Sequence, residues 1–263
     1  LDNWLNISGK VFDGRLSLSW TYSEAMFDHA TIEHLADQLI SQLQVLVQHC
    51  LDEEVWAVTP SDFPLANLSQ AQLDALPLPA ARIDDLYGLS AMQQGMLFHS
   101  LYQHGTGDYI SQMRLGIHGL DPQRFAAAWQ AVIDSHDILR TGFVWQNLAQ
   151  PVQVVQRRVR LPYALHDWRG RSNQAQALDE LADDQRQKGF DLAEAPLLRL
   201  VLVRMQDDQY HLVYTHHHIL MDGWSASRLL GEVLQRYSGQ VPETSSGRYV
   251  EYIGWLKAQD LAG

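Results

Sequence analysis

The sequence is poor in positive charge. It holds 19 lysine and arginine residues against 31 aspartate and glutamate residues, which gives a net charge of −12. Most of the imbalance lies in residues 1–80, with two basic and eleven acidic side chains. Attraction to phosphate supplies most of the affinity of proteins for nucleic acids, and the chain has no Lys/Arg-rich run. We therefore expect no nucleic-acid partner.

Cysteine and long apolar segments are also scarce. Cys50 is the one cysteine in the sequence, which excludes a disulfide within the chain. No apolar segment approaches the ~18 residues that a membrane-spanning helix needs, so no membrane partner is expected. The sequence begins at Leu1 without the pattern of a signal peptide. We expect a piece of a longer cytoplasmic chain.

The material for a folded core is present. Hydrophobic residues make up 46% of the 263 residues, and this length suits one or two domains. Residues 1–50 predict a β-hairpin that turns at Asp13 and Gly14, followed by a helix over 29–50. Apolar residues recur along that helix at steps of three and four, and Cys50 lies on the same face. Cys50 is therefore expected to be buried and inert.

The composition changes over residues 51–84. Four prolines between 60 and 79 break regular structure, and a short helix is predicted to start from Ser69 as its cap. These features are typical of a linker between two domains. Local order is expected where Phe63 and Leu65 can dock.

From residue 85 onward, helical and strand patterns alternate, which predicts an α/β lobe over 85–263. Helices are expected to start near residues 90, 122, 173, 224 and 249. Strands are expected around 115–117, 140–146, 152–159, 197–205 and 210–216, the last two as a hairpin. Because these last two have dense apolar runs, at least one of them should be central in the sheet. A Gly/Ser/Pro-rich loop is expected over 238–247.

Residues that carry chemistry gather at the end of the last strand. His216, His217 and His218 follow an apolar run, and Asp222 and Gly223 come four and five residues after the third histidine. Imidazole titrates near neutral pH, so a histidine held at a strand end can move protons. The aspartate could set the imidazole tautomer, cap the next helix or pair with an arginine. The glycine lets backbone approach closely.

Three interpretations compete for these histidines. Adjacent residues of a strand point to opposite faces, so at most His216 and His218 could share a metal ion. No other Cys/His cluster completes a set of ligands, and no metal is expected. The residues alone leave open a structural role, as hydrogen-bonded core histidines, and a catalytic role in acyl transfer.

Four segments bear on this choice. They read SAMQQGMLFH at 90–99, SHDILRTGF at 135–143, HHILMDG at 217–223 and YVEYIGW at 249–255. In this order they resemble the first, second, HHxxxDG and fourth core motifs of the condensation-domain superfamily of nonribosomal peptide synthetases. The second motif is usually written RHExLRTxF and the fourth YxDYAxW. Four residues depart from these patterns without touching the assigned chemistry, namely Ser135, Asp137, Glu251 and Gly254.

The resemblance implies a chloramphenicol-acetyltransferase-like lobe with a mixed sheet and flanking helices. Complete domains of the family pair two such lobes around a tunnel, and the motifs of the second lobe are missing here. The MQQGMLFH form of the first motif is similar to domains that accept a D-configured donor, which follow epimerization domains. Residues 1–50 resemble the C-terminal end of an epimerization or other condensation-type domain, and residues 51–84 resemble the linker that follows.

The resemblance also implies an activity and a central residue. Amide bonds are formed between a donor thioester and an acceptor amine, both carried on the phosphopantetheine of peptidyl carrier domains, and no cofactor is bound directly. His218 is expected to take a proton or position the amine. The Gly223 N–H is a candidate oxyanion donor, and His217 is expected to support the fold. His136 is expected to pack or to join a polar network.

The neighbouring residues receive supporting roles. Asp222 is expected to make a structural ion pair, with Arg140 as one candidate partner and an arginine beyond residue 263 as the other. Trp224 is expected to pack at the start of the next helix, with lining of the substrate site as the alternative. Ser225 is expected to support the substrate or the fold.

The partners implied are the upstream and downstream peptidyl carrier domains, the neighbouring epimerization domain and the missing second lobe. The product class would be a peptide antibiotic or a siderophore. Two other function classes remain open. One is a free-standing acyltransferase that uses coenzyme A thioesters, and the other is a non-catalytic module that docks a carrier or an adjacent domain.

Overall fold

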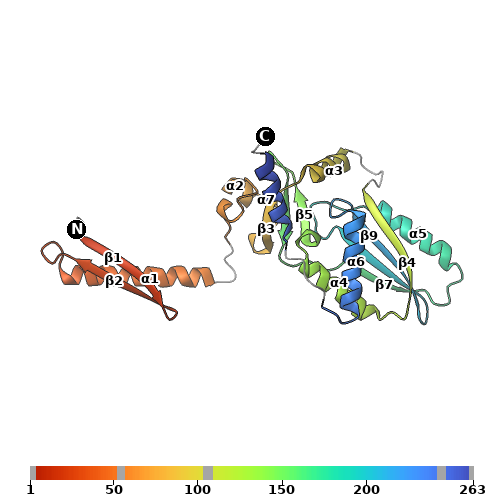
Figure 1. Cartoon of the computed structure of the whole chain (residues 1–263), viewed down its shortest axis with the longest axis horizontal. Helices are drawn as coiled ribbons and strands as arrows, with labels where there is room; N and C mark the ends of the chain where they lie inside the picture. Colours follow the sequence, from red (N-terminus) through yellow and green to blue (C-terminus); the bar gives the residue numbers. More distant parts are fainter. Residues whose placement is uncertain (1–3, 52–56, 103–108, 242–246, 261–263) are drawn as a thin grey trace. The chain divides into compact units, whose positions relative to one another are not determined.

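The structure, a computed structural model, describes residues 4–51, 57–102, 109–241 and 247–260. The chain divides into two compact units, Leu1–Trp56 and Ala57–Gly263 (Figure 1). Within the described part of the chain, no helix is both long enough and apolar enough to cross a bilayer.

Unit 1 is a β-hairpin followed by one long helix, as the sequence predicts. Its elements are β1 (Leu5–Phe12), β2 (Arg15–Tyr22) and α1 (His29–Leu51). The turn residues Asp13 and Gly14 have φ values of +50° and +71°. A type I′ turn requires positive φ at both central residues, and this turn matches the twist of the two strands it joins.

Little of unit 1 is buried. Ile32 is the one buried residue of α1, whereas Leu46 and Val47 are more than half exposed. Cys50 is exposed as well, so the prediction that it is buried is wrong. The periodic apolar face of the helix exists, but within this unit the hairpin leaves the last turns of α1 uncovered.

The larger sheet of unit 2 has four strands in the order β4-β9-β8-β7. The bounds are β4 (Ile110–His118), β7 (Tyr163–Asp167), β8 (Leu198–Gln206) and β9 (Gln209–His217). β7 runs parallel to β8 and the other pairs are antiparallel, so the sheet is mixed, as predicted. Both strands of the predicted 197–216 hairpin are central.

Helices cover both faces of this sheet (Figure 1). On one face lie α4 (Pro122–Ser135) and α6 (Gly223–Tyr237), and on the other lies α5 (Gln174–Gln187). Leu200 and Leu202 share a core with α4 and α6, whereas Val201 and Val203 pack with α5. Successive residues of a strand point to opposite faces, which explains why β8 is apolar throughout.

A second, antiparallel sheet of three strands has the order β3-β6-β5. Its strands are β3 (Ile83–Gly88), β5 (Thr141–Val144) and β6 (Val152–Gln156). Part of the expected linker packs against it, because Phe63, Leu73 and Leu76 share a core with strand residues of this sheet. Residues 57–84 thus belong to unit 2, while residues 52–56 lie outside the described residues.

The remaining helices start where capping residues predict. Ser69 and Ser90 each accept a hydrogen bond from the backbone N–H three residues ahead, at the starts of α2 (Gln70–Asp74) and α3 (Ala91–Tyr102). The last helix is α7 (Tyr249–Asp260), and short 3₁₀ turns are η1 (Pro60–Asp62), η2 (Ala80–Arg82) and η3 (Asp137–Arg140). Residues 242–246 of the expected 238–247 loop lie outside the described residues.

One glycine of the smaller sheet allows a close backbone approach. A Cβ atom on Gly142 would lie 2.6 Å from the backbone oxygen of Ala193. Gly142→Ala should therefore lower the free energy of unfolding by about 1–3 kcal/mol in urea denaturation. Gly116→Ala is the matched control, since its Cβ would meet no atom within 4 Å. Equal unfolding midpoints for the two variants would contradict this packing.

Candidate active site

Strand β9 brings the histidines to a fixed place at the end of the larger sheet. His217 pairs with Ile110 of β4, and His216 pairs with Leu198 of β8. The backbone turns at His218, and α6 begins five residues later at Gly223. The histidines and the N-terminus of α6 are thus joined by a short loop.

The His217 side chain is buried and bonded at both ring nitrogens. It is 3% exposed, and its Nδ1 accepts a hydrogen bond of 3.1 Å from the Ile219 backbone N–H. Its Nε2 lies 3.3 Å from the Ser100 Oγ on α3. Burial lowers the pKa of His217 to about 4, with further lowering from the charges of His218 and His216. His217 is therefore neutral near pH 7 and held at both ring nitrogens.

His216 points away from His217. It stacks on Tyr214, with 4.9 Å between the ring centroids, and Tyr214 packs in the core shared with α4 and α6. Burial lowers the pKa of His216 to about 4 as well. This alternation is the one expected along a strand. No group of three metal-ligating side chains occurs among the residues that the structure describes.

His218 has a fixed backbone and an available ring. Its N–H donates a 2.7 Å hydrogen bond to the Tyr109 carbonyl, just before β4. Tyr109 has a φ of +65°, a region that few residues other than glycine enter. The His218 side chain is half-buried, and within the described residues no group hydrogen-bonds to its ring. Such a ring is free to bind a substrate group.

Asp222 caps helix α6. Its carboxylate accepts a 2.7 Å hydrogen bond from the Ser225 N–H. That bond lowers the pKa of Asp222, and the charge of His218 lowers it further. Asp222 is exposed and makes no ion pair within the described ranges, so the expectation that it pairs with Arg140 is wrong. Ser225 supports the fold by donating to this cap.

The first residues of α6 face open space. A Cβ atom on Gly223 would meet no described atom within 4 Å. Trp224 is 77% exposed, so the expectation that it packs at the start of the helix is wrong. The first N–H groups of a helix have no partner inside it and carry partial positive charge. This end of α6 can accept an approaching oxyanion.

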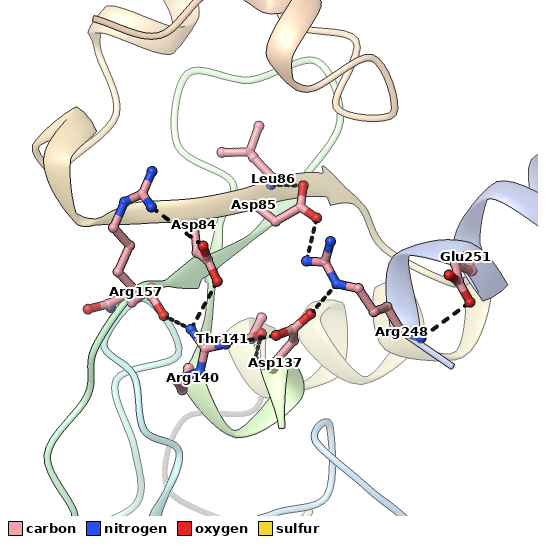
Figure 2. Close-up of polar contacts among 10 residues, drawn as sticks. Asp84, Asp85, Leu86, Asp137, Arg140, Thr141, Arg157, Arg248 and Glu251 are labelled. Atoms are coloured by element: carbon pink, nitrogen blue, oxygen red, sulfur yellow. Dashed lines mark hydrogen bonds and ion pairs between the residues drawn. The ribbon is translucent and has the colours of Figure 1, made fainter. Parts of the chain in front are cut away.

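Arg140 belongs to a different cluster (Figure 2). Its guanidinium donates to the Gln156 carbonyl and pairs with Asp137 at 2.7 Å and with Asp84 at 3.2 Å. The Arg140 side chain is 7% exposed. Its three partners lie on β3, β6 and η3. The guanidinium therefore forms its ion pairs with carboxylates around the smaller sheet. This explains why it does not reach Asp222.

Arg248 extends the same cluster to the last helix (Figure 2). It pairs with Asp85 at 2.9 Å and with Asp137 at 3.0 Å. The carboxylate of Asp137 raises the pKa of Arg248. The residues around the fourth motif are thus tied to those of the second motif by charge pairs.

A cavity of about 1220 Å³ lies among the end of α4, α6 and the start of α7. His136 and Glu232 line it, and a hydrogen bond of 2.6 Å joins the His136 Nε2 to the Glu232 carboxylate. This pair confirms the polar network that the sequence predicts for His136. Met221 and Ser225 also line the cavity, but His218 is not among its lining residues.

Sequence reasoning missed Ser100 and Tyr109 as contacts of the histidine turn. Both come from the α3–β4 part of the chain, about one hundred residues before the turn. Pairing of β4 with β9 brings them together. No local periodicity carries this information.

The sequence of the chain is similar to those of known proteins. The family model described as "Condensation domain" matches residues 83–262. The chain is 40% identical to one of the linear gramicidin synthase proteins of Brevibacillus parabrevis over 97% of its own length. It is 32% identical to bacitracin synthase 1 of Bacillus licheniformis over 94% of its length. It spans about 5% of the length of each of these relatives.

Solved structures share the fold. The starter condensation domain of rhizomide synthetase matches with a TM-score of 0.57 and 26% identity, over 66% of this chain and 45% of that one. The EpoB cyclization-docking bidomain from Sorangium cellulosum matches with a TM-score of 0.57 over 96% of this chain and 46% of that one. Its identity is 20%, so it shows the fold alone.

The capping role of Asp222 can be separated from its charge. Asp222→Ala removes the acceptor of the Ser225 N–H and should lower the melting temperature by about 2–4 °C. Asp222→Asn keeps an oxygen at the same place and should melt close to the wild type. Thermal unfolding followed by circular dichroism measures both. A loss in the asparagine variant as large as in the alanine variant would indicate that charge, and not capping, is what matters.

The buried histidines predict a loss of stability in mild acid. Unfolded histidines bind protons near pH 6.5, whereas the pKa values of His216 and His217 in the fold are about 4. Stability should therefore fall as pH drops from about 6.5 to 4, by at most about 3 kcal/mol for each histidine. His216→Phe keeps the ring stack with Tyr214 and removes one proton site. Urea denaturation at pH 7 and pH 4.5 should show a smaller loss in this variant, and equal losses would refute the assignment.

Proposed function

The chain belongs to the condensation-domain family of nonribosomal peptide synthetases, and from this we propose that it supplies the histidine-bearing lobe of a domain that forms peptide bonds between carrier-bound substrates. The observation that carries the proposal is the end of β9. There the ring of His218, to which no described residue hydrogen-bonds, follows a fixed strand, and the open N-terminus of α6 lies five residues on.

The proposed chemistry is acyl transfer from sulfur to nitrogen. The acceptor amine attacks the carbonyl carbon of the donor thioester, a C–N bond forms, and the C–S bond breaks. The proton lost by the amine is transferred in turn to the leaving thiolate of the donor phosphopantetheine. His218 takes this proton or positions the amine, and the N–H of Gly223 faces the negative oxygen of the tetrahedral intermediate.

The lobe is proposed to act with neighbours. The rhizomide domain is matched over less than half of its length, which supports a second lobe as the other wall of the site. Similarity to the linear gramicidin synthase protein extends over 97% of the chain, which supports residues 1–50 as the end of an upstream domain in a synthetase. We assign that domain to the epimerization type, and the donor to the D configuration, on the MQQGMLFH segment.

The remaining partners follow from the reaction. Upstream and downstream peptidyl carrier domains present the two substrates on phosphopantetheine arms. Holding both arms in one site supplies much of the rate of such a transfer. We place the synthetase in the cytoplasm and its product among peptide antibiotics or siderophores. A single cysteine offers no disulfide framework of the kind that exported proteins use.

His218→Ala tests the assignment in the complete condensation domain that contains these residues. With both carriers preloaded, the single-turnover rate of peptide-bond formation should fall by ~10²–10⁴-fold, because a general acid–base group is lost. His118→Ala, at an exposed strand end of β4, is the matched control and should keep the wild-type rate. A wild-type rate in His218→Ala would contradict the catalytic role of His218. An alanine variant that no longer binds loaded carriers would favour a docking role instead.

A further inference from the structure

We propose that Ser100 is a positioning residue for the condensation reaction, because its hydroxyl holds His217 in one neutral tautomer and so fixes the turn that carries His218. This inference rests on the proposed function and adds a residue to it. Ser100 lies near the end of α3, one position after the segment SAMQQGMLFH.

The tautomer follows from the two bonds of the His217 ring. A backbone N–H can only donate, so the Nδ1 atom that receives the Ile219 N–H must carry a lone pair. A neutral imidazole then has its hydrogen on Nε2. The Ser100 Oγ, 3.3 Å from Nε2, is the acceptor for this hydrogen. Both ring nitrogens are therefore satisfied in one tautomer only.

These bonds close the turn around His218. The His217 ring reaches past His218 to the Ile219 N–H, and the Leu220 N–H donates to the His217 carbonyl at 3.2 Å. The His218 N–H is itself held by Tyr109. His218 thus lies inside a small hydrogen-bonded turn, and Ser100 of α3 contacts this turn through the His217 ring.

Burial makes the choice of tautomer matter. His217 is 3% exposed, so water does not readily replace a lost partner. A ring with hydrogen on Nδ1, or on both nitrogens, would face the Ile219 N–H with another N–H. That arrangement would push Ile219 away and loosen the turn. Ser100 disfavours it by accepting from Nε2.

The tautomer of His217 can be measured by NMR, without an assay of enzymatic activity. In the 263-residue chain labelled with ¹⁵N-histidine, NMR should show His217 as the Nε2–H form between pH 6 and 8. Ser100→Ala should give a mixture of tautomers, because the Nε2 hydrogen loses its acceptor. Ser100→Thr keeps a hydroxyl and should restore the wild-type spectrum. An unchanged His217 spectrum in Ser100→Ala would overturn the inference.

Kinetics tests the effect on the reaction. In the complete condensation domain, Ser100→Ala should lower the single-turnover rate about 3–10-fold, the effect of one lost hydrogen bond. The carrier concentration at half-saturation should stay unchanged, since Ser100 acts on His217 and not on the carriers. Ser100→Thr should recover the rate. Ser172→Ala, an exposed serine before α5, should match the wild type.

A double-mutant cycle separates positioning from general stability. His217→Asn keeps an oxygen near the place of Nδ1 for the Ile219 N–H but has no atom that reaches Ser100. If Ser100 acts through His217, adding Ser100→Ala to His217→Asn should change the rate no further. The same fold-loss in both backgrounds would overturn the inference. A wild-type domain without activity would instead count against the proposed function, and the NMR spectra would still decide the role of Ser100.

Discussion

The site depends on the central position of β9. This strand is paired on both sides, with β4 and with β8, and is covered by helices on both faces. A slip of one residue would exchange the faces of His216 and His217, and it would take Tyr214 out of the core that it shares with α4 and α6. The register therefore determines which histidine is buried against Tyr214, which reaches α3 and which is left at the turn. The position of His218 follows from packing several residues earlier in the strand.

The charged residues divide into two separate groups. Arg140 is buried in the layer of the smaller sheet, where the two terminal nitrogens of its guanidinium bind Asp84, Asp137 and a backbone carbonyl. Asp222 caps α6 and interacts with His218. One group holds the layers of the lobe together, and the other caps the helix that follows the histidine turn.

Sequence patterns were sufficient where the signal was local. The Asp13-Gly14 hairpin, the capped helices and the 197–216 hairpin were predicted from turn chemistry and periodicity. Strands β3 and β7 were missed because the first carries Asp84 and Asp85 and the second is a five-residue edge strand with exposed residues. Their strand geometry comes from pairing with β6 and β8, which no local pattern records.

For the site, the sequence predicted which residues share one loop but not which distant residues they contact. The motif located His217, His218, Asp222 and Gly223 in one loop, and the structure keeps them together. It did not show that Asp222 and Arg140 lie apart, that Trp224 is exposed, or that Ser100 reaches His217. These facts depend on which surfaces meet in three dimensions, and the residues concerned have ordinary sequence surroundings.

The contact between Ser100 and His217 has a consequence for the newly made chain, because the two residues are 117 positions apart. Ribosomes add about 5–20 residues per second, so α3 is complete on the order of ten seconds before β9 leaves the ribosome. During that interval β4 has an unpaired edge, which is the kind of surface that chaperones and misfolding partners bind. The last two strands form a local hairpin and can fold quickly once made. The histidine turn is therefore assembled only after β9 has been made, and a nascent chain that stalls before residue 217 contains β4 and β8 but lacks His217 and His218.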